Sequence, residues 1–294
     1  DDHRSARRAD GDHRDDHHDS VTVGRLAALL AVAAVVCVGC GGGANANEVL
    51  SETAENLGEI RSGDLSLRLV VAAAGGEQVG VELAGPFAFP EGEELPLADV
   101  EVTRIAGEER TTVRFISTGE RAYVEVGEET FELPGAQAER FRGARGGGTN
   151  GGGLAELRIE DWFGDAELSD GGEVGGAETD RVSARLDVVA AANDLLELAR
   201  AFGGVDARAL RGASADQLQR AVESATIVVH TGEDDRLLRR LAIDARLRPD
   251  VPPELDDTLG TFGRARFTLE LGIANPNRPV SVEEPENAQP YPED

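Results

Sequence analysis

The sequence contains no lysine and no methionine. All 29 basic residues are therefore arginine, and the lack of lysine excludes a P-loop and any enzyme that forms a lysine Schiff base. Acidic residues outnumber basic ones by 56 to 29, so the formal net charge is −27. Such a negative surface repels nucleic-acid phosphates, so we expect no nucleic-acid partner.

Histidine and cysteine are also scarce. Beyond residue 18 the only histidine is His230, and the only cysteines are Cys37 and Cys40. A Ser–His–Asp triad would have to use His230, yet no G-x-S-x-G motif accompanies it. These counts also exclude a zinc site built from cysteine or several histidines. We therefore expect no catalytic residue, no metal and no cofactor, and we place His230 on the polar face of a strand.

The N-terminal region has the pattern of a bacterial signal peptide. Arg25 precedes an unbroken apolar run at residues 26–38, which as a helix is about 20 Å long and too short for a hydrocarbon core of about 30 Å. Val38-Gly39-Cys40 resembles the end of a lipobox, in which the cysteine is acylated and becomes the new N-terminus. Cys37 is a poorer acceptor because the bulky Val36 precedes it.

These features divide the start of the chain into two parts. We expect residues 1–39 to be a removed signal peptide and residues 40–47 to be a flexible tether that carries lipid on Cys40. Residues 1–20 are rich in Asp, Arg and His and do not resemble a signal peptide's start. We expect them to be a spurious extension, with translation beginning at Val21 or Val23.

Most of the remaining chain alternates between apolar and polar residues, which predicts strands with one apolar face. The clearest case is the pair of segments 237–247 and 265–273. The predicted strands are residues 64–73, 79–83, 100–105, 111–117, 122–126, 130–133, 181–188, 225–231, 237–247 and 265–273.

Helical periodicity occurs in fewer places. Residues 45–61, 193–202 and 214–225 have a 3.6-residue apolar repeat, the last with Ser214 and Gln217 at capping-box spacing. A short helix is expected at residues 154–162, after an interruption of the strands at 135–176. Strands and helices that are separated in sequence indicate the α+β class. We predict a large curved antiparallel sheet, an incomplete β-barrel of about ten strands, with three or four helices over its apolar concave face.

Several short motifs are misleading. Residues 146–151 match G-x-G-x-x-G, but the surrounding glycines at 146–153 indicate a loop, and no βαβ unit frames it. The acidic loops at 233–235 and 254–257 lack EF-hand spacing. The proline-rich acidic tail, residues 286–294, is expected to fray at its end. The single domain is therefore expected to span residues 48–285.

We expect the apolar strand faces to exceed what the protein can cover with its own side chains, although a fully packed core without a cavity stays an alternative. Aromatic residues make up 4% of the chain and methionine is absent, so bulky residues that fill a core are few. Apolar clefts bind apolar ligands. The residues expected to line such a cavity are Leu65, Leu67, Leu69, Val71, Val79, Val81, Leu83, Val113, Phe115, Val124, Val126, Leu186, Val188, Leu241, Ile243, Leu247, Phe267, Leu269 and Leu271.

The order of these elements resembles a known family. The chain begins with a lipobox cysteine, a helix and a strand meander, which are followed by the Asp161-Trp162-Phe163 element, a strand and helices. It ends in a closing block that contains Asn275-Pro276 and Pro279-Val280. This order resembles that of the LppX/LprG-type envelope lipoproteins of actinobacteria, whose fold is similar to that of LolA and LolB. The resemblance implies an incomplete barrel around an apolar cavity that holds acyl chains, with no enzymatic activity. Of its functional residues only Cys40 carries over, as the acylated position.

The sequence therefore predicts a monomeric, lipid-anchored protein on the extracytoplasmic side of the cell membrane that binds and carries or presents lipids. The strong acidity favours neutral or zwitterionic lipid over an anionic glycolipid. Two alternatives stay open. One is a structural or sensory envelope lipoprotein that binds a partner protein, and the other is a glycan hydrolase that uses two carboxylates about 5–9 Å apart.

Overall fold

The computed structural model describes residues 45–73, 75–90, 95–135, 137–138, 158–201, 209–248 and 265–292. The chain divides into two compact units, residues 1–43 and 44–294, and all that follows concerns the second. The predicted lipidation site Cys40, the glycine-rich stretch 146–153 and the acidic loop 254–257 lie outside the described residues.

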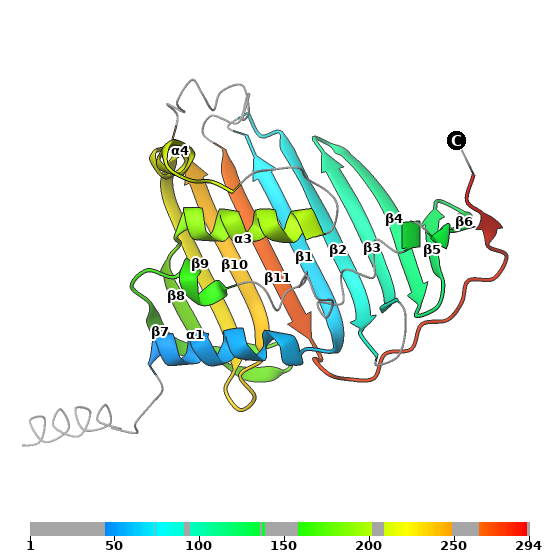
Figure 1. The fold of residues 1–294 in the computed structure, drawn as a ribbon, viewed down its shortest axis with the longest axis horizontal. Coiled ribbons are helices and arrows are strands. Elements are labelled where there is room, and N and C mark those ends of the chain that lie inside the picture. Colours follow the sequence, from blue (N-terminus) through cyan, green and yellow to red (C-terminus); the bar gives the residue numbers. More distant parts are fainter. Residues whose placement is uncertain are drawn as a thin grey trace, which may run out of the picture. The chain divides into compact units, whose positions relative to one another are not determined.

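One sheet of twelve strands forms the second unit's described part (Figure 1). Its order is β12-β6-β5-β4-β3-β2-β1-β11-β10-β9-β8-β7, antiparallel throughout except for the β12–β6 pair. The strands are β1 Ser62–Ala72, β2 Gln78–Ala88, β3 Leu97–Ala106, β4 Glu109–Thr118, β5 Ala122–Val126, β6 Glu129–Glu132, β7 Glu167–Val174, β8 Ala177–Arg185, β9 Val222–Gly232, β10 Leu238–Leu247, β11 Arg266–Ala274 and β12 Gln289–Pro290.

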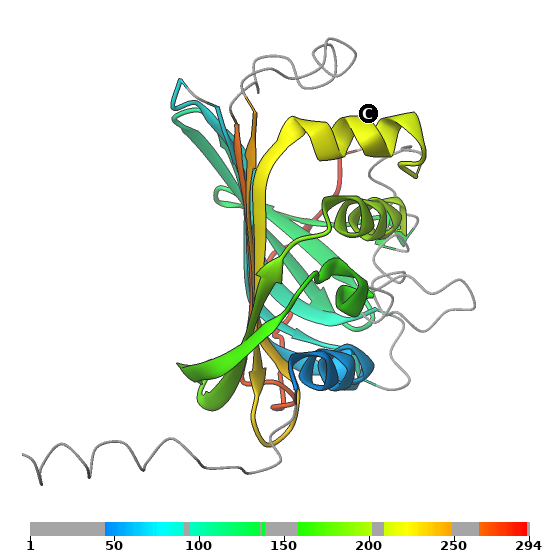
Figure 2. The same cartoon turned by 90° about the vertical axis from the view of Figure 1, so that its left-hand side faces the viewer.

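The helices lie on one side of this sheet (Figure 2). They are α1 Ala46–Glu55, α3 Val188–Ala201 and α4 Ala213–Ala221, with the short 3-10 helices η1 Asn56–Glu59 and η4 Ile159–Trp162. The sheet is curved and does not close, because β12 and β7 are its two edges. The predicted α+β fold with an incomplete barrel is therefore confirmed.

All ten predicted strands are present, with boundaries shifted by a few residues, and two further strands were not predicted. β7 lies inside the expected interruption; its sequence holds only Leu168 and Val174 as bulky apolar residues, and it pairs with β8 alone. β12 is two residues long. Neither strand buries an alternating apolar face, so neither carries the pattern that identifies a strand.

Two local predictions for the helices were wrong. Val188 was assigned to a strand but begins α3, because Asp187 Oδ1 accepts hydrogen bonds from the backbone N–H groups of Val189 and Ala190 and caps the helix. Ser214 was expected to cap the last helix, but it lies inside α4, where its hydroxyl bonds with the backbone of Arg211.

The side chains of β8, β9, β10, β11 and β1 pack under the helices and form the main core. Leu241 and Ile243 of β10 lie opposite Leu271 and Leu269 of β11, so all four point to the helix side. Trp162, which is 1% exposed, joins this cluster from η4. A smaller cluster of Leu95, Ala122 and Ala138 packs near β4–β6. The helices thus cover the half of the sheet that ends at β1.

The opposite face of the sheet is polar and carries cross-strand ion pairs. Glu82 of β2 pairs with Arg68 of β1 and with Arg110 of β4. Arg114 of β4 bridges Asp99 and Glu125, with its Nε 2.6 Å from Asp99 Oδ1. These pairs are largely solvated and contribute little to stability individually. They do keep this face wet and so make the two faces of the sheet chemically distinct.

The segment after β11 is held against the start of β1. Asn275 and Asn277 have positive φ angles of 51° and 61°, a conformation that asparagine tolerates well. Asn277 Oδ1 accepts from the Arg61 N–H at 2.7 Å, and the Asn277 N–H donates to the Ser62 carbonyl at 2.8 Å. This explains why the Asn275-Pro276 block closes the fold.

The acidic tail is also anchored. Glu284 accepts a hydrogen bond of 2.7 Å from the Tyr123 hydroxyl and pairs with Arg121. Burial and this hydrogen bond raise the pKa of Tyr123 to about 12. β12 then pairs with β6 as far as Pro290, and the ring of Tyr291 packs edge to face against Phe131. The last two residues of the tail, 293 and 294, lie outside the described residues, so fraying at the end of the tail stays a prediction.

Asp194 of α3 provides a test of how the helix layer is held. Its buried carboxylate accepts hydrogen bonds from Trp162 Nε1 at 2.9 Å and from the backbone N–H of Arg158 at 3.1 Å. We expect Asp194→Ala to lower the free energy of unfolding by about 2–3 kcal/mol, because it leaves the buried Trp162 N–H without an acceptor. Urea unfolding followed by Trp162 fluorescence measures this.

The control for this substitution is Glu197→Ala, which removes an exposed carboxylate from the same helix. We expect it to change the free energy of unfolding by less than about 0.5 kcal/mol. Equal effects of the two substitutions would contradict a specific role for Asp194.

Candidate functional site

The structure brings most of the predicted lining residues to one face of the sheet. In β1 these are Leu65, Leu67, Leu69 and Val71, and each lies opposite an apolar residue on both neighbouring strands, or a glycine in the case of Leu65. The same row continues through β2 with Val79, Val81 and Leu83, through β4 with Val113 and Phe115, and into β5 with Val124. Antiparallel partners share a face, so the row is continuous.

The predicted residues differ in how far they are buried. Leu186, Leu241, Ile243, Leu269 and Leu271 are buried in the main core, while Leu65, Leu67, Leu69, Val188 and Phe267 are partly exposed and pack against it. Phe115 packs against the smaller cluster. Leu247 is partly exposed at the end of β10. Val126 is 48% exposed at the end of β5. Whether these residues line a ligand cavity stays a prediction.

Between the two clusters lies a strip of apolar side chains that belongs to neither of them. We call it the central strip. All of its members are only partly buried, which means that the described residues leave part of each side chain accessible. Its members are Val71, Val79, Val81, Leu83, Val102 and Val113.

Val102 of β3 was not among the predicted lining residues, although it joins two that were. It lies directly opposite Leu83 on one side and Val113 on the other. The alternation of Val100 and Val102 with Glu101 and Thr103 carries the signal that would have identified it.

One charged residue of β3, Arg104, lies on the same face of the sheet as the central strip. Arg104 lies opposite Val81 of β2 and Thr111 of β4, so its side chain shares the face of the central strip. Arg104 is exposed and forms no ion pair within the described part of the chain. A cation beside an apolar surface is suited to a ligand with an apolar body and a polar end.

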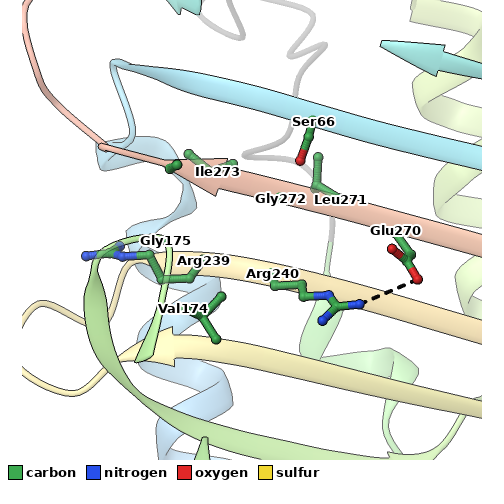
Figure 3. Close-up of a pocket in the computed structure, with 10 residues that line it drawn as sticks. Ser66, Val174, Gly175, Arg239, Arg240, Glu270, Leu271, Gly272 and Ile273 are labelled. Carbon is green, nitrogen blue, oxygen red and sulfur yellow. Dashed lines mark ion pairs between the residues drawn. The ribbon is translucent and has the colours of Figure 1, made fainter. Parts of the chain in front are cut away.

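A pocket of about 260 Å³ lies on the other, polar face of the sheet (Figure 3). It is not the apolar cavity that the sequence predicts, because Ser66, Arg240 and Glu270 line it and these alternate with the apolar row. Its single carboxylate is Glu270. The paired acids that the hydrolase alternative needs therefore do not meet here.

Among the described residues, no three His, Cys, Asp or Glu side chains gather in a way that could hold a metal ion. In the acidic loop 233–235, Asp235 is already engaged: its carboxylate pairs with Arg239 and accepts from the Leu237 N–H at 3.0 Å.

His230 lies on the polar face of β9, as predicted, opposite Arg181 of β8 and Arg240 of β10. Its Nδ1 is 3.3 Å from the Thr179 hydroxyl. Partial burial, together with the positive charges of Arg240 and Arg181, lowers the pKa of His230 below its ordinary value of 6.5. The neutral imidazole is therefore the favoured form at pH 7. The neighbours of His230 in the described structure are Thr179, Arg240 and Arg181, so none of them is a carboxylate that could orient it as the base of a catalytic triad.

Comparisons with known proteins find likeness in structure but not in sequence. No protein-family profile matches the chain, and no curated protein matches it. Among solved structures, the crystal structure of LprF from Mycobacterium bovis is similar with a TM-score of 0.44 and 12% sequence identity, over 83% of this chain and 99% of that one. A likeness of this degree assigns neither family nor ligand.

The lowered pKa of His230 predicts a pH dependence of stability. Below pH 6.5 the unfolded chain takes up a proton on His230 that the folded protein resists, so the free energy of unfolding should fall as the pH falls. His230→Gln should make this fall less steep between pH 7.5 and 5. Urea unfolding of both proteins across this range measures the difference, and identical slopes would contradict the account.

Proposed function

We propose that this protein is an envelope lipoprotein that binds the acyl chains of lipids along the central strip and carries or presents them. The observation that supports this most is the strip itself: a row of aliphatic side chains that crosses β1 to β4 and is left partly accessible on the helix side of the sheet. Contiguous apolar surface of this kind marks binding sites for apolar partners.

The energetics suit a lipid. Each CH₂ group moved from water to an apolar surface contributes about 0.8 kcal/mol. Four adjacent strands about 4.8 Å apart span roughly 14 Å, so the strip offers contact to many methylenes of one chain. Valine and leucine supply no hydrogen-bonding groups, so such binding depends on chain length and not on a specific polar chemistry.

Arg104 suggests how the bound lipid is oriented. An acyl chain on the strip would place its polar head beside Arg104 and Thr111, where a phosphate oxygen can accept hydrogen bonds from the guanidinium. A zwitterionic headgroup fits both this cation and the protein's net charge of −27, which disfavours a lipid with a net negative charge.

The membrane attachment is proposed from the sequence. The apolar run 26–38 followed by Gly39 and Cys40 supports a cut before Cys40 and acylation of its side chain. Among the described residues no helix is long and apolar enough to cross a membrane. The acyl groups would then hold the domain at the envelope through the tether 40–47.

Leu83 and Ala84 test the strip with neighbouring substitutions on opposite faces of β2. Leu83→Arg places a charge on the central strip, whereas Ala84→Arg places the same charge on the polar face, where Ala84 is exposed. We expect Leu83→Arg to weaken lipid binding at least tenfold, because the acyl chain would desolvate the guanidinium, and Ala84→Arg to leave binding unchanged. Native mass spectrometry of delipidated protein mixed with envelope lipids counts the adducts.

A second pair of substitutions controls for loss of binding that is caused by misfolding of one variant. Val113→Arg lies on the strip and Thr112→Arg on the exposed polar face of the same strand, β4. Absence of adducts in the unsubstituted protein, or equal binding by all four variants, would contradict the proposal and favour a surface that binds a protein partner.

Cys40 and Cys37 form the matched pair for the anchor. We expect Cys40→Ser to abolish lipid attachment, so that the protein moves from the detergent phase to the aqueous phase in phase separation of cell extracts. Cys37→Ser should leave partitioning unchanged, since bulky Val36 makes Cys37 a poor acceptor. Intact-mass measurement reports the acyl groups, and lipid on Cys37 would overturn the assignment.

A further inference from the structure

The pocket on the polar face lies over a glycine, Gly272 of β11. Ser66 of β1 and Arg240 of β10 both lie directly opposite Gly272 of β11, so the three residues form one row across three strands. A side chain on Gly272 would meet the Ser66 hydroxyl, since a Cβ there would lie 2.5 Å from Ser66 Oγ. Glycine therefore makes room for the Ser66 hydroxyl, and we call the surface over Gly272, between Ser66 and Arg240, the notch.

A β-bulge brings a second arginine to the same place. The pairing of β10 with β9 shifts by one residue between Leu238 and Arg240, so Arg239 is the extra residue. Regular alternation would send one of two consecutive residues to each face, and the bulge re-aims them. Arg239 and Arg240 thus both line the pocket, Arg239 reaching past Gly175 and Arg240 turning toward Glu270 (Figure 3).

Arg239 is 5% exposed, and its charge is only partly satisfied. Its Nη1 donates to the Leu237 carbonyl at 3.2 Å and its Nη2 to Asp235 at 2.5 Å. Its Nε–H is buried and has no acceptor in the described structure. A buried donor without a partner is costly, so such a group indicates a ligand or water that supplies the missing acceptor.

Hydrogen-bond donors exceed acceptors around this notch. The Ser66 hydroxyl has no partner among the described residues, and Arg240 has one loose contact, 3.5 Å from Nη2 to Glu270 Oε1. Arg239 also lines the pocket, beside Gly175, where a Cβ would lie 3.3 Å from Arg239 Cδ. Glu270 is the only acceptor side chain besides the serine.

We propose that this notch binds a small oxyanion, of the phosphate or carboxylate class, over Gly272 between Arg240 and Ser66. The volume of about 260 Å³ is below the usual range for drug-sized ligands and suits a group of a few atoms. The site faces away from the central strip, so it is independent of acyl-chain binding.

Two sources can supply the phosphate, a free ion and a lipid headgroup, and the experiment has one arm for each source. In the first, inorganic phosphate is titrated by calorimetry into the full domain at constant ionic strength, with chloride as the reference. In the second, the same protein is mixed with phosphatidylcholine vesicles, with vesicles of a phosphate-free glycolipid as the reference.

Three variants locate the site. Arg240→Gln removes one cation, and Ser66→Phe fills the notch from an exposed position, so both should fold. We expect each to weaken binding about tenfold or more. Arg246→Gln removes the same charge from the same face of β10, outside the pocket, and should bind like the unsubstituted protein.

The outcomes separate cleanly. Saturable binding of phosphate that Arg240→Gln and Ser66→Phe abolish supports a site for a free anion, and the same pattern with vesicles alone supports a headgroup. Binding in neither arm, or equal loss in Arg246→Gln, would overturn the proposal and leave ordered water as the partner of Arg239.

Discussion

The fold depends on one constraint: the register that keeps apolar side chains on the same face of the nine adjacent strands from β5 to β8. Leu67 of β1 lies opposite Leu271 of β11 and Leu83 of β2, and each of these continues the row to the next strand. A shift of one residue in any pair would turn that strand's leucines and valines to the polar face. The antiparallel hydrogen bonds and the hydrophobic effect therefore enforce the same arrangement.

That arrangement divides the sheet into a covered half and a less covered half. Helices α1, α3 and η4 pack on β8–β11, where Leu241, Ile243 and Ile227 are almost fully buried. Beyond β1 the described residues leave the central strip partly accessible. The helices carry one narrow apolar stripe each, which is why a sheet this wide is not sealed by them alone.

The sequence predicts the strands well because period-two alternation is a direct signature of a half-buried strand. Residues 237–247 show this most clearly: their alternation identifies β10 and the face of Leu241. It misses what alternation does not encode. β7 is polar at a sheet edge, Val188 begins a helix because Asp187 caps it, and the bulge at Arg239 breaks the alternation itself.

The candidate site follows the same division. Alternation alone places Leu65–Val71 and Val79–Leu83 on one face, but it does not tell which residues the helices bury. The notch at Gly272 depends on three strands distant in sequence and on a bulge, and neither leaves a pattern in the residues. Such sites become visible only when the register is known.

The central claim is that acyl chains lie on the strip formed by β1, β2, β3 and β4. A lipid with a photoactivatable group in its acyl chain, cross-linked to the protein and mapped by peptide mass spectrometry, tests this most directly. The account predicts labels on peptides that contain Val81, Leu83, Val102 and Val113. Labels confined to the polar face, or spread evenly over the protein, would contradict it.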